Sequence, residues 1–291
     1  MVKVEELGDG AFRIPGRTII GIVCVDKDCY LIDTGLDDDQ GRKALNAVKS
    51  LNLKLKAVVN THSHADHIGG NSFVEKRTGV DIFGPLEEIS FIREPRLEPV
   101  MLYGGNPVPD LLSKFFMAKP SDAKPVEHAS LPLKLVDLRG HSPGMIGIQT
   151  DQVFFVADAY TSINLLKKHV IPYTYDPELA LKTLESLLDT KGLLYVPFHG
   201  EPSRKPEEEI EANMAAIEKT RETMLDVLRN DLGTCEVVSK VLSQLNVKII
   251  NTALYFLYES MLKGYLTWLK RDGLIASKVE SNKIVWRRIK A

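Results

Sequence analysis

The sequence has few cysteines and no long apolar run. Cys24, Cys29 and Cys235 are the three cysteines among 291 residues, an odd and low count that argues against a disulfide framework and for a reducing compartment. No stretch is apolar enough to span a lipid bilayer, and the first six residues lack the apolar core of a secretory signal peptide. A net charge of −2 argues against a protein that binds nucleic acid through its overall charge. We therefore expect a cytoplasmic globular protein that does not associate with membranes.

Two domains are expected from the order of the elements, one over residues 1–205 and a smaller one over residues 206–291. In the first, short apolar strands alternate with helices, such as helices 38–50 and 68–78. A further helix begins after Asp176, because aspartate is a common N-cap and a proline follows it at the first helical position. The predicted strands cover residues 12–14, 19–25, 30–32, 57–59, 80–83, 131–138, 145–149, 153–156 and 193–196.

The regular pattern stops between Glu87 and Ala129. This stretch contains several prolines and aromatic clusters such as Phe115-Phe116, and we expect long loops and short helices there. Long loops in a compact domain are usually functional, so we expect this region to form a lid over a pocket. The aromatic and large apolar side chains considered for its lining are Phe91, Tyr103, Phe115, Phe116, Met117, Tyr160 and Tyr173.

The C-terminal part is predicted to contain helices 206–228, 234–245 and 250–271, followed by strands 274–279 and 284–289. Two helices and a β-hairpin resemble a winged-helix domain. Residues 231–291 contain ten Lys or Arg against five Asp or Glu, which favours nucleic-acid binding weakly. The apolar stripe of helix 250–271 is more typical of a core or of a dimer face. It comprises Leu254, Leu257, Met261, Leu262, Tyr265, Leu266 and Leu269.

Five of the seven histidines lie in three short motifs, and the segment Thr61-His62-Ser63-His64-Ala65-Asp66-His67 holds three of them. Imidazole and carboxylate groups are typical ligands of zinc and related divalent ions. In an extended segment, residues two apart point the same way, so His62 and His64 can bind one ion. Asp66 and His67 follow where the chain turns toward a helix, and they can bind a second ion.

Further candidate ligands follow other apolar strands. His141, Asp158 and His199 each come after such a strand, as expected when several strands deliver side chains to one edge of a sheet. His128 and His169 have no such partners, and we expect no metal-binding role for either.

These motifs resemble those of the metallo-β-lactamase superfamily, in the same order along the chain, with Asp33 in Leu31-Ile32-Asp33-Thr34-Gly35 as a further match. The resemblance covers about residues 1–230 and implies a four-layer αββα sandwich. It also implies that His62, His64 and His141 bind one metal ion and that Asp66, His67 and His199 bind the other. Asp158 would bridge the two ions, and Asp33 would orient the ligands from behind.

The resemblance further implies hydrolysis by a metal-bridging hydroxide, which Asp66 would help to orient as the catalytic residue. We expect two divalent ions, with zinc ahead of iron or manganese. Zinc β-lactamases lack an aspartate at the position of Asp158, which argues against an antibiotic as the substrate. Glyoxalase II-like thioesterases and small endoribonuclease-like members remain. We expect a small ester or thioester, with a small-molecule acyl group, as the substrate.

The alternatives are a metal-dependent endoribonuclease or phosphodiesterase acting on RNA, and a mononuclear iron persulfide dioxygenase. A DNA-binding regulator without enzymatic activity is the least favoured, because it would not need seven ligands in this order.

Overall fold

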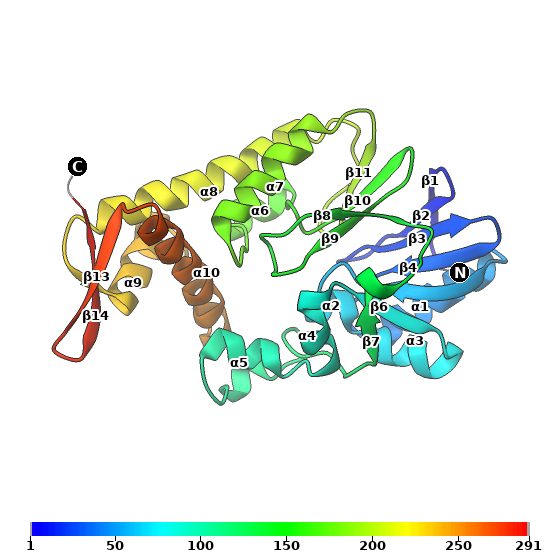
Figure 1. Ribbon diagram of the computed structural model, residues 1–291, viewed down its shortest axis with the longest axis horizontal. Helices are drawn as coiled ribbons and strands as arrows, with labels where there is room; N and C mark the ends of the chain where they lie inside the picture. Colours follow the sequence, from blue (N-terminus) through cyan, green and yellow to red (C-terminus); the bar gives the residue numbers. More distant parts are fainter. Residues whose placement is uncertain (1, 290–291) are drawn as a thin grey trace.

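The computed structural model describes residues 2–289. A seven-stranded sheet begins near the N-terminus, and its strands carry the first candidate ligands. Within residues 2–289, α1 (Asp38–Ser50) and α3 (Asn71–Thr78) cover the outer face of the sheet (Figure 1). The strands from β1 to β4 run antiparallel, whereas those from β4 to β7 run parallel. The strands, in sheet order, are β1 (Glu5–Gly8), β2 (Ala11–Ile14), β3 (Ile20–Val25), β4 (Asp28–Ile32), β5 (Lys54–Val59), β6 (Asp81–Gly84) and β7 (Ala123–Pro125).

A second sheet packs face to face against the first. Its order is β11 (Leu194–Pro197), β10 (Val153–Ala157), β9 (Ile146–Gln149) and β8 (Lys134–Asp137). Along β10, Phe155 points into the core between the sheets, whereas Phe154 points to the opposite side, where α7 (Pro177–Asp189) packs. This alternation follows from the two-residue period of a strand. The layers therefore run helix, sheet, sheet, helix, and the predicted αββα sandwich is confirmed.

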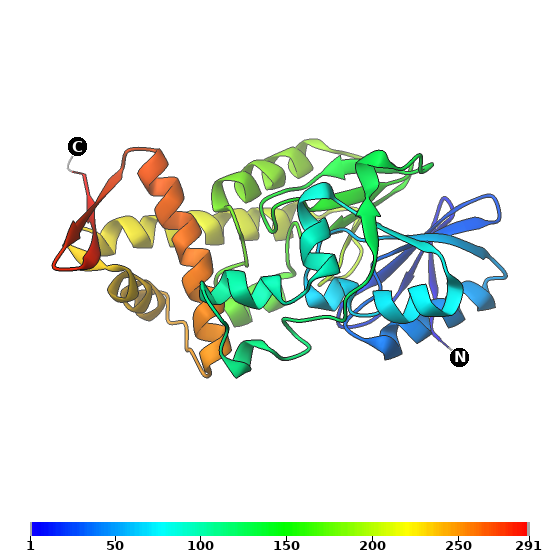
Figure 2. The same cartoon turned by 60° about the horizontal axis from the view of Figure 1, so that its bottom comes forward.

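The C-terminal part adds helices and a small sheet beyond the fourth layer. The long helix α8 (Glu207–Val227) runs from the sandwich to this part (Figure 2), which also contains α9 (Thr234–Gln244) and α10 (Thr252–Arg271). Its sheet has the order β12 (Leu232–Gly233), β14 (Lys283–Arg288) and β13 (Ile275–Glu280). The predicted elements are present, whereas the winged-helix likeness and the boundary after residue 205 stay predictions.

One hydrophobic core crosses that proposed boundary. It joins Phe154 of β10 and Leu184 of α7 to Leu262 of α10 and Ile275 of β13. Most of the predicted apolar stripe of α10 is buried within the chain itself, at Met261, Leu262, Tyr265, Leu266 and Leu269. Most of this stripe therefore belongs to the core, and a dimer stays a prediction.

The predicted helix 68–78 is interrupted. Helix α2 (Ala65–Ile68) ends before Gly69 and Gly70, and α3 starts after them. A Cβ atom at Gly69 would lie 1.9 Å from the carbonyl oxygen of Leu36, so the chain passes here too closely for any other residue. Asp66 and His67 therefore lie on the short helix α2 and not on the longer helix α3.

The region 87–129 contains loops and short helices, as predicted. Helices α4 (Ile89–Arg93) and α5 (Leu97–Tyr103) lie here, with three single-turn 3-10 helices nearby: η1 (Leu86–Glu88), η2 (Pro109–Leu111) and η3 (Val126–His128). Some elements were not predicted: the short strands β1, β7 and β12, and helix α6 (Ile163–His169). Ser162 caps α6 by accepting a hydrogen bond from the backbone of Leu165. Among the described residues, no helix is both long and apolar enough to cross a membrane.

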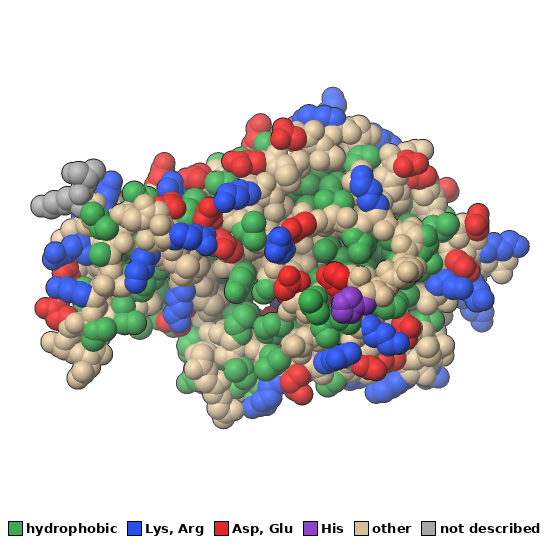
Figure 3. Space-filling view, in the orientation of Figure 1, with side chains coloured by type: hydrophobic (Ala, Val, Ile, Leu, Met, Phe, Trp, Pro, Cys, Tyr) green, Lys and Arg blue, Asp and Glu red, His purple; other side chains and the backbone are tan. Residues whose placement is uncertain are grey.

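Hydrophobic side chains reach the surface over α5. Leu97, Met101 and Tyr103 are partly exposed there, and the space-filling view shows hydrophobic side chains over α5 and the adjoining part of α10 (Figure 3). The ring of Tyr103 stacks edge-on against Phe256 of α10, with 5.0 Å between centroids. Through this contact the 87–129 region packs against the C-terminal part.

Candidate metal centre

The candidate ligands come from the ends of neighbouring strands. Asp33 follows β4, the His62–His67 motif follows β5, Asp158 follows β10 and His199 lies just beyond β11. Because β4 and β5 are parallel, and so are β10 and β11, each pair of strands ends at one edge of its own sheet. The contacts of Asp158 with His67 and of His199 with Asp66 show that the two edges lie together. Asp33 and Ala157, the residue before Asp158, have left-handed backbone conformations with φ of 60° and 49°. Such conformations are costly for residues other than glycine and often occur at functional sites.

The first motif changes conformation within a few residues. His64 is extended, with φ −62° and ψ 143°, and it caps the N-terminus of α2, which carries Asp66 and His67. The change from extended chain to helix sends the two pairs of side chains in different directions, as the sequence predicts. His62 and His64 face His141, whereas Asp66 and His67 face His199.

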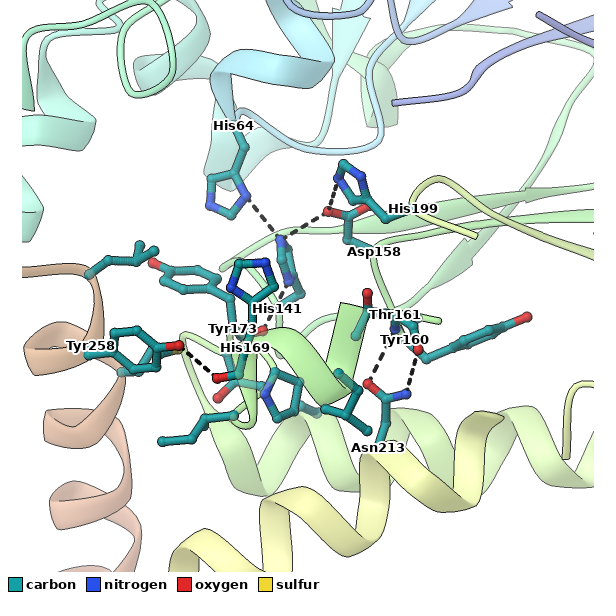
Figure 4. A pocket seen from close by; sticks show the side chains of 18 of the residues that line it. His64, His141, Asp158, Tyr160, Thr161, His169, Tyr173, His199, Asn213 and Tyr258 are labelled. Carbon is teal, nitrogen blue, oxygen red and sulfur yellow. Dashed lines mark hydrogen bonds and ion pairs between the residues drawn. The ribbon is translucent and has the colours of Figure 1, made fainter. Parts of the chain in front are cut away.

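Three imidazole nitrogens converge at one point. Nδ1 of His64 lies 3.0 Å from Nε2 of His62 and 3.0 Å from Nε2 of His141. Nitrogens bound to a tetrahedral zinc ion at about 2.0–2.1 Å lie about 3.3 Å apart, so the three nitrogens are close to the required spacing. Figure 4 shows His64 and His141 facing each other beside Asp158.

A second set of atoms converges beside the first. Nε2 of His199 lies 3.3 Å from Oδ2 of Asp66 and 3.2 Å from Oδ2 of Asp158. The same Asp158 oxygen is 3.4 Å from Nε2 of His67 and 3.6 Å from Nε2 of His141. Asp158 thus stands between the two sets, where the resemblance puts a bridging ligand.

Two buried polar atoms at this point lack a hydrogen-bond partner among the described residues: Nε2 of His67 and Oδ1 of Asp158. Leaving such groups buried and unpaired is costly, and bound cations would give them partners. The residues present therefore fit a pair of divalent ions, by donor type, by spacing and by these unpaired atoms.

The outer nitrogens of the imidazoles are held by other parts of the chain. Nδ1 of His141 lies 3.1 Å from the carbonyl oxygen of Tyr173, and Nδ1 of His199 lies 3.1 Å from that of Arg17. Such contacts fix the orientation of a ring and determine which nitrogen is free to bind a metal.

Asp33 supports both sets. Its Oδ2 accepts hydrogen bonds from Nδ1 of His67 at 2.7 Å and from the hydroxyl of Thr61 at 2.6 Å, and its Oδ1 accepts from the backbone N–H of Thr61. Nδ1 of His62 in turn lies 3.0 Å from the Thr61 hydroxyl oxygen. Both oxygens of Asp33 are already occupied, which favours a supporting role over metal ligation.

Thr18 is a supporting residue that the sequence did not indicate. Its hydroxyl donates a 2.9 Å hydrogen bond to Oδ2 of Asp66, and its side chain is buried. Thr18 lies before β3, 48 residues from Asp66, and no local motif identifies it. Only the packing of β3 beside the strand ends brings the two together.

Burial and neighbouring charges give the histidines of the two ligand sets different pKa values. Burial lowers the pKa of His62, lowers that of His64 to about 4 and lowers that of His141 to about 3. These rings are therefore neutral at pH 7, as metal ligands must be. Burial also lowers the pKa of His199, but the carboxylates of Asp158 and Asp66 outweigh it and raise that pKa to about 10.

His67 behaves like His199. Burial lowers its pKa, but Asp158, Asp66 and Asp33 raise it well above the usual value. The carboxylates of the second set thus favour a positive charge beside His67 and His199. A bound metal ion would supply that charge.

A cavity of about 330 Å³ opens onto the cluster. His64, Asp66, His141, Asp158 and His199 line it. Figure 4 shows His64, His141, Asp158 and His199 close together on one side of it. Apolar side chains form most of the remaining wall, including Phe115 and Phe116 from the 87–129 region and Leu254, Leu257 and Met261 from α10. Glu98 of α5 also lines the cavity, and its carboxylate has no ion-pair or hydrogen-bond partner among residues 2–289.

The predicted pocket lining is correct in part. Phe115, Phe116, Tyr160 and Tyr173 line the cavity, whereas Phe91, Tyr103 and Met117 do not. Tyr103 packs on Phe256 instead. His128 lies in η3 away from both ligand sets, and His169 lines the cavity without joining either set.

The sandwich and the histidine–aspartate cluster at its edge define the class of protein. The family model for the Metallo-beta-lactamase superfamily matches residues 14–199, and the chain belongs to this superfamily.

Curated relatives and a solved structure agree with this assignment. The chain is 25% identical over 122 residues to the hydroxyacylglutathione hydrolase GloC of Haemophilus influenzae, over 42% of this chain and 55% of that protein. It is 32% identical over 141 residues to the probable metallo-hydrolase YybB of Bacillus subtilis, over 47% of this chain and 58% of that protein. The chain thus spans just over half the length of these relatives.

Among solved structures, a metallo-beta-lactamase family protein from Thermus thermophilus is similar in fold, with a TM-score of 0.74 and 21% identity. The alignment covers 97% of this chain and all of that chain, so the likeness in fold extends through the C-terminal part. The two curated relatives are thus named as a hydroxyacylglutathione hydrolase and a probable metallo-hydrolase.

Proposed function

We propose that the protein is a hydrolase that binds two divalent metal ions, with zinc as the first expectation, and cleaves small thioesters or esters. His62, His64 and His141 would hold one ion, and Asp66, His67 and His199 the other, with Asp158 shared. The spacing of the nitrogens and the unpaired atoms of His67 and Asp158 support this assignment. When bound, the two ions supply an activated water and stabilise negative charge on the substrate oxygen.

Asp66 would be the catalytic residue. Thr18 fixes its Oδ2, and the carboxylate faces the cavity in which a substrate would lie. Asp66 can therefore accept a hydrogen bond from the attacking water and hold the lone pair of that water toward the scissile carbonyl. Burial raises the pKa of Asp66, but His67 and His199 outweigh it and keep the group ionised.

The observation that carries the substrate proposal is the apolar cavity that ends at the ligand cluster. An acyl chain can lie between Phe116 and Leu257 with its carbonyl group at the aspartates and histidines. An RNA backbone, which is a polyanion, gains little from such a wall. A thioester or ester of a small acyl group fits it better.

The test is a panel of acyl thioesters on glutathione, coenzyme A and N-acetylcysteamine, measured with the protein as purified, after removal of metal by a chelator, and after restoration with Zn²⁺. Turnover that disappears on chelation, returns with Zn²⁺ and is lost in His64→Ala supports the proposal. Absence of metal-dependent turnover across the panel contradicts it. A matched control is His128→Ala, which removes a histidine away from the cluster.

RNA cleavage is the second candidate, favoured by the ten Lys or Arg against five Asp or Glu in residues 231–291. Cleavage of single-stranded RNA that depends on His64 would support it in place of the first. Metal analysis separates both from an iron dioxygenase, which would hold one iron and consume oxygen.

A further inference from the structure

Glu88 is a fully buried carboxylate that lies between two ligand-bearing loops. It ends η1, directly after β6, and its side chain is 0% exposed. No arginine, lysine or histidine pairs with it among the described residues. A buried charge of this kind is expensive unless hydrogen bonds compensate for it.

Hydrogen-bond donors from two different loops compensate for it. Oε2 of Glu88 accepts from the backbone N–H of Ser63 at 3.2 Å and from the Ser63 hydroxyl. Oε1 accepts from the Ser142 hydroxyl at 2.6 Å and from the backbone N–H of Gly144 at 2.7 Å. Each oxygen therefore holds one loop, and the carboxylate joins the two.

Both loops carry ligands of the three-histidine set. Ser63 lies between His62 and His64, and Ser142 follows His141. The loop of His141 also packs closely on the segment before Glu88, because a Cβ atom at Gly144 would lie 3.0 Å from Cβ of Glu87. Glu88 thus fixes the distance between the two chain segments that must meet at one ion.

The orientation of His64 depends on the hydrogen bonds of Glu88 more than that of His62 or His141 does. The outer nitrogen of His62 contacts Thr61, and that of His141 contacts the carbonyl oxygen of Tyr173. Among residues 2–289, Nε2 of His64 has no hydrogen-bond partner, and its Nδ1 faces the cluster. The position of His64 therefore relies on its backbone, which Ser63 anchors to Glu88.

We infer that Glu88 is a positioning residue for the metal ion held by His62, His64 and His141, and that it sets the affinity of this site separately from the second site. The inference rests on the two-site arrangement proposed above. The second set is supported by other residues, Asp33, Thr18 and the carbonyl group of Arg17.

Glu88→Gln is the sharpest substitution. Glutamine keeps the shape but replaces one oxygen with an NH₂ group, a donor that would face a backbone N–H. One loop then loses its acceptor, whichever way the amide turns. Outer partners of metal ligands typically contribute 10–100-fold to affinity. The matched control is Glu87→Gln, because Glu87 is the exposed neighbour.

The experiment is a calorimetric titration of the metal-free full-length protein with Zn²⁺, accompanied by the melting temperature of the metal-free state. His199→Ala, which removes a ligand of the second set, identifies the signal of the three-histidine site. We expect two sites in the unmodified protein. In Glu88→Gln we expect the three-histidine site to bind Zn²⁺ about 10–100-fold more weakly, with the second site changed less than about threefold.

If Glu88→Gln leaves the Zn²⁺ affinity of the three-histidine site unchanged, the inference is overturned. It is also overturned if both sites weaken equally and the melting temperature of the metal-free protein falls. If Glu88→Gln does not fold, Ser63→Ala and Ser142→Ala each remove one hydroxyl donor and keep the carboxylate. We expect each to weaken the three-histidine site measurably, and unaltered Zn²⁺ binding in both would contradict the inference. Because no substrate is used, a failed thioesterase assay leaves this test unaffected.

Discussion

Oδ2 of Asp33 and Nδ1 of His67 lie 2.7 Å apart, and both side chains are 0% exposed. This contact aims Nε2 of His67 at Asp158, because the carboxylate holds the proton of His67 on Nδ1. The same Asp33 oxygen accepts from Thr61, whose hydroxyl oxygen contacts His62. One carboxylate therefore orients a candidate ligand of each ion.

Asp33→Asn tests this arrangement. In asparagine an NH₂ group replaces one of the two oxygens. In place of Oδ2 it would face the donors of His67 and the Thr61 hydroxyl, and in place of Oδ1 it would face the backbone N–H of Thr61. We expect about 10–100-fold weaker Zn²⁺ binding, with both sites affected. Calorimetric titration measures it, and Asp39→Asn on the exposed surface of α1 is the control. Wild-type affinity at both sites would show that Asp33 does not orient the ligands.

The candidate ligands could be predicted from the sequence because they are dense and local. His62 to His67 form one motif, and the other candidates come within a few residues of the ends of apolar strands. Helix α1 and the Asp176 cap of α7 were also predictable, since an amphipathic pattern and a cap are local signals.

Residues that act through distant contacts could not be predicted. Thr18 and Glu88 reach the cluster only after the strands have packed, and neither belongs to a sequence pattern. The break at Gly69 depends on the passage of Leu36 beside it, which the helical pattern of residues 68–78 does not encode. The seven residues of α6 are too few to give a clear helical period.

The space inside the apolar cavity should limit the length of the acyl chain that the protein accepts. Leu257→Trp places a larger ring in the wall formed by α10. We expect kcat/KM for an octanoyl thioester to fall about tenfold or more, a loss of about 1.4 kcal/mol in transition-state stabilisation, and kcat/KM for an acetyl thioester to change less than about threefold. The control is Ile250→Trp, because Ile250 is 80% exposed in the same part of the chain. An equal loss for both chain lengths would contradict the placement of the acyl group.

The continuous core predicts that the sandwich and the C-terminal part unfold together. Leu262 of α10 is fully buried in the core that also contains Phe154 of β10. We expect Leu262→Ala to cost about 2–5 kcal/mol in the free energy of unfolding, with a single transition in both circular dichroism and calorimetry. The exposed control Lys240→Ala should stay within about 0.5 kcal/mol. Two separate transitions would instead support an independent domain after residue 205.

Glu98 should make stability depend on pH. Burial, together with the carboxylates of Asp66 and Glu88, raises the pKa of Glu98 well above its usual value. Because the folded state then holds this proton more tightly than the unfolded state, stability falls as pH rises through and above the unfolded pKa. Glu98→Gln removes this loss, so we expect the melting temperature of metal-free Glu98→Gln to exceed that of the unmodified protein by more at pH 8 than at pH 5.

Thermal melts over this pH range, with the exposed Glu94→Gln as control, measure the effect. A difference between Glu98→Gln and the unmodified protein that stays constant with pH would show that Glu98 is not held in a protonated state by its surroundings.

The most direct test of the two-metal hydrolase is a stoichiometric one. Metal-free protein is titrated with Zn²⁺ while hydrolysis of an acyl thioester is followed. The account predicts that activity rises until about two equivalents are bound, one for each ligand set beside Asp158. Saturation at one equivalent, or full occupancy without hydrolysis of any ester or thioester, would contradict it.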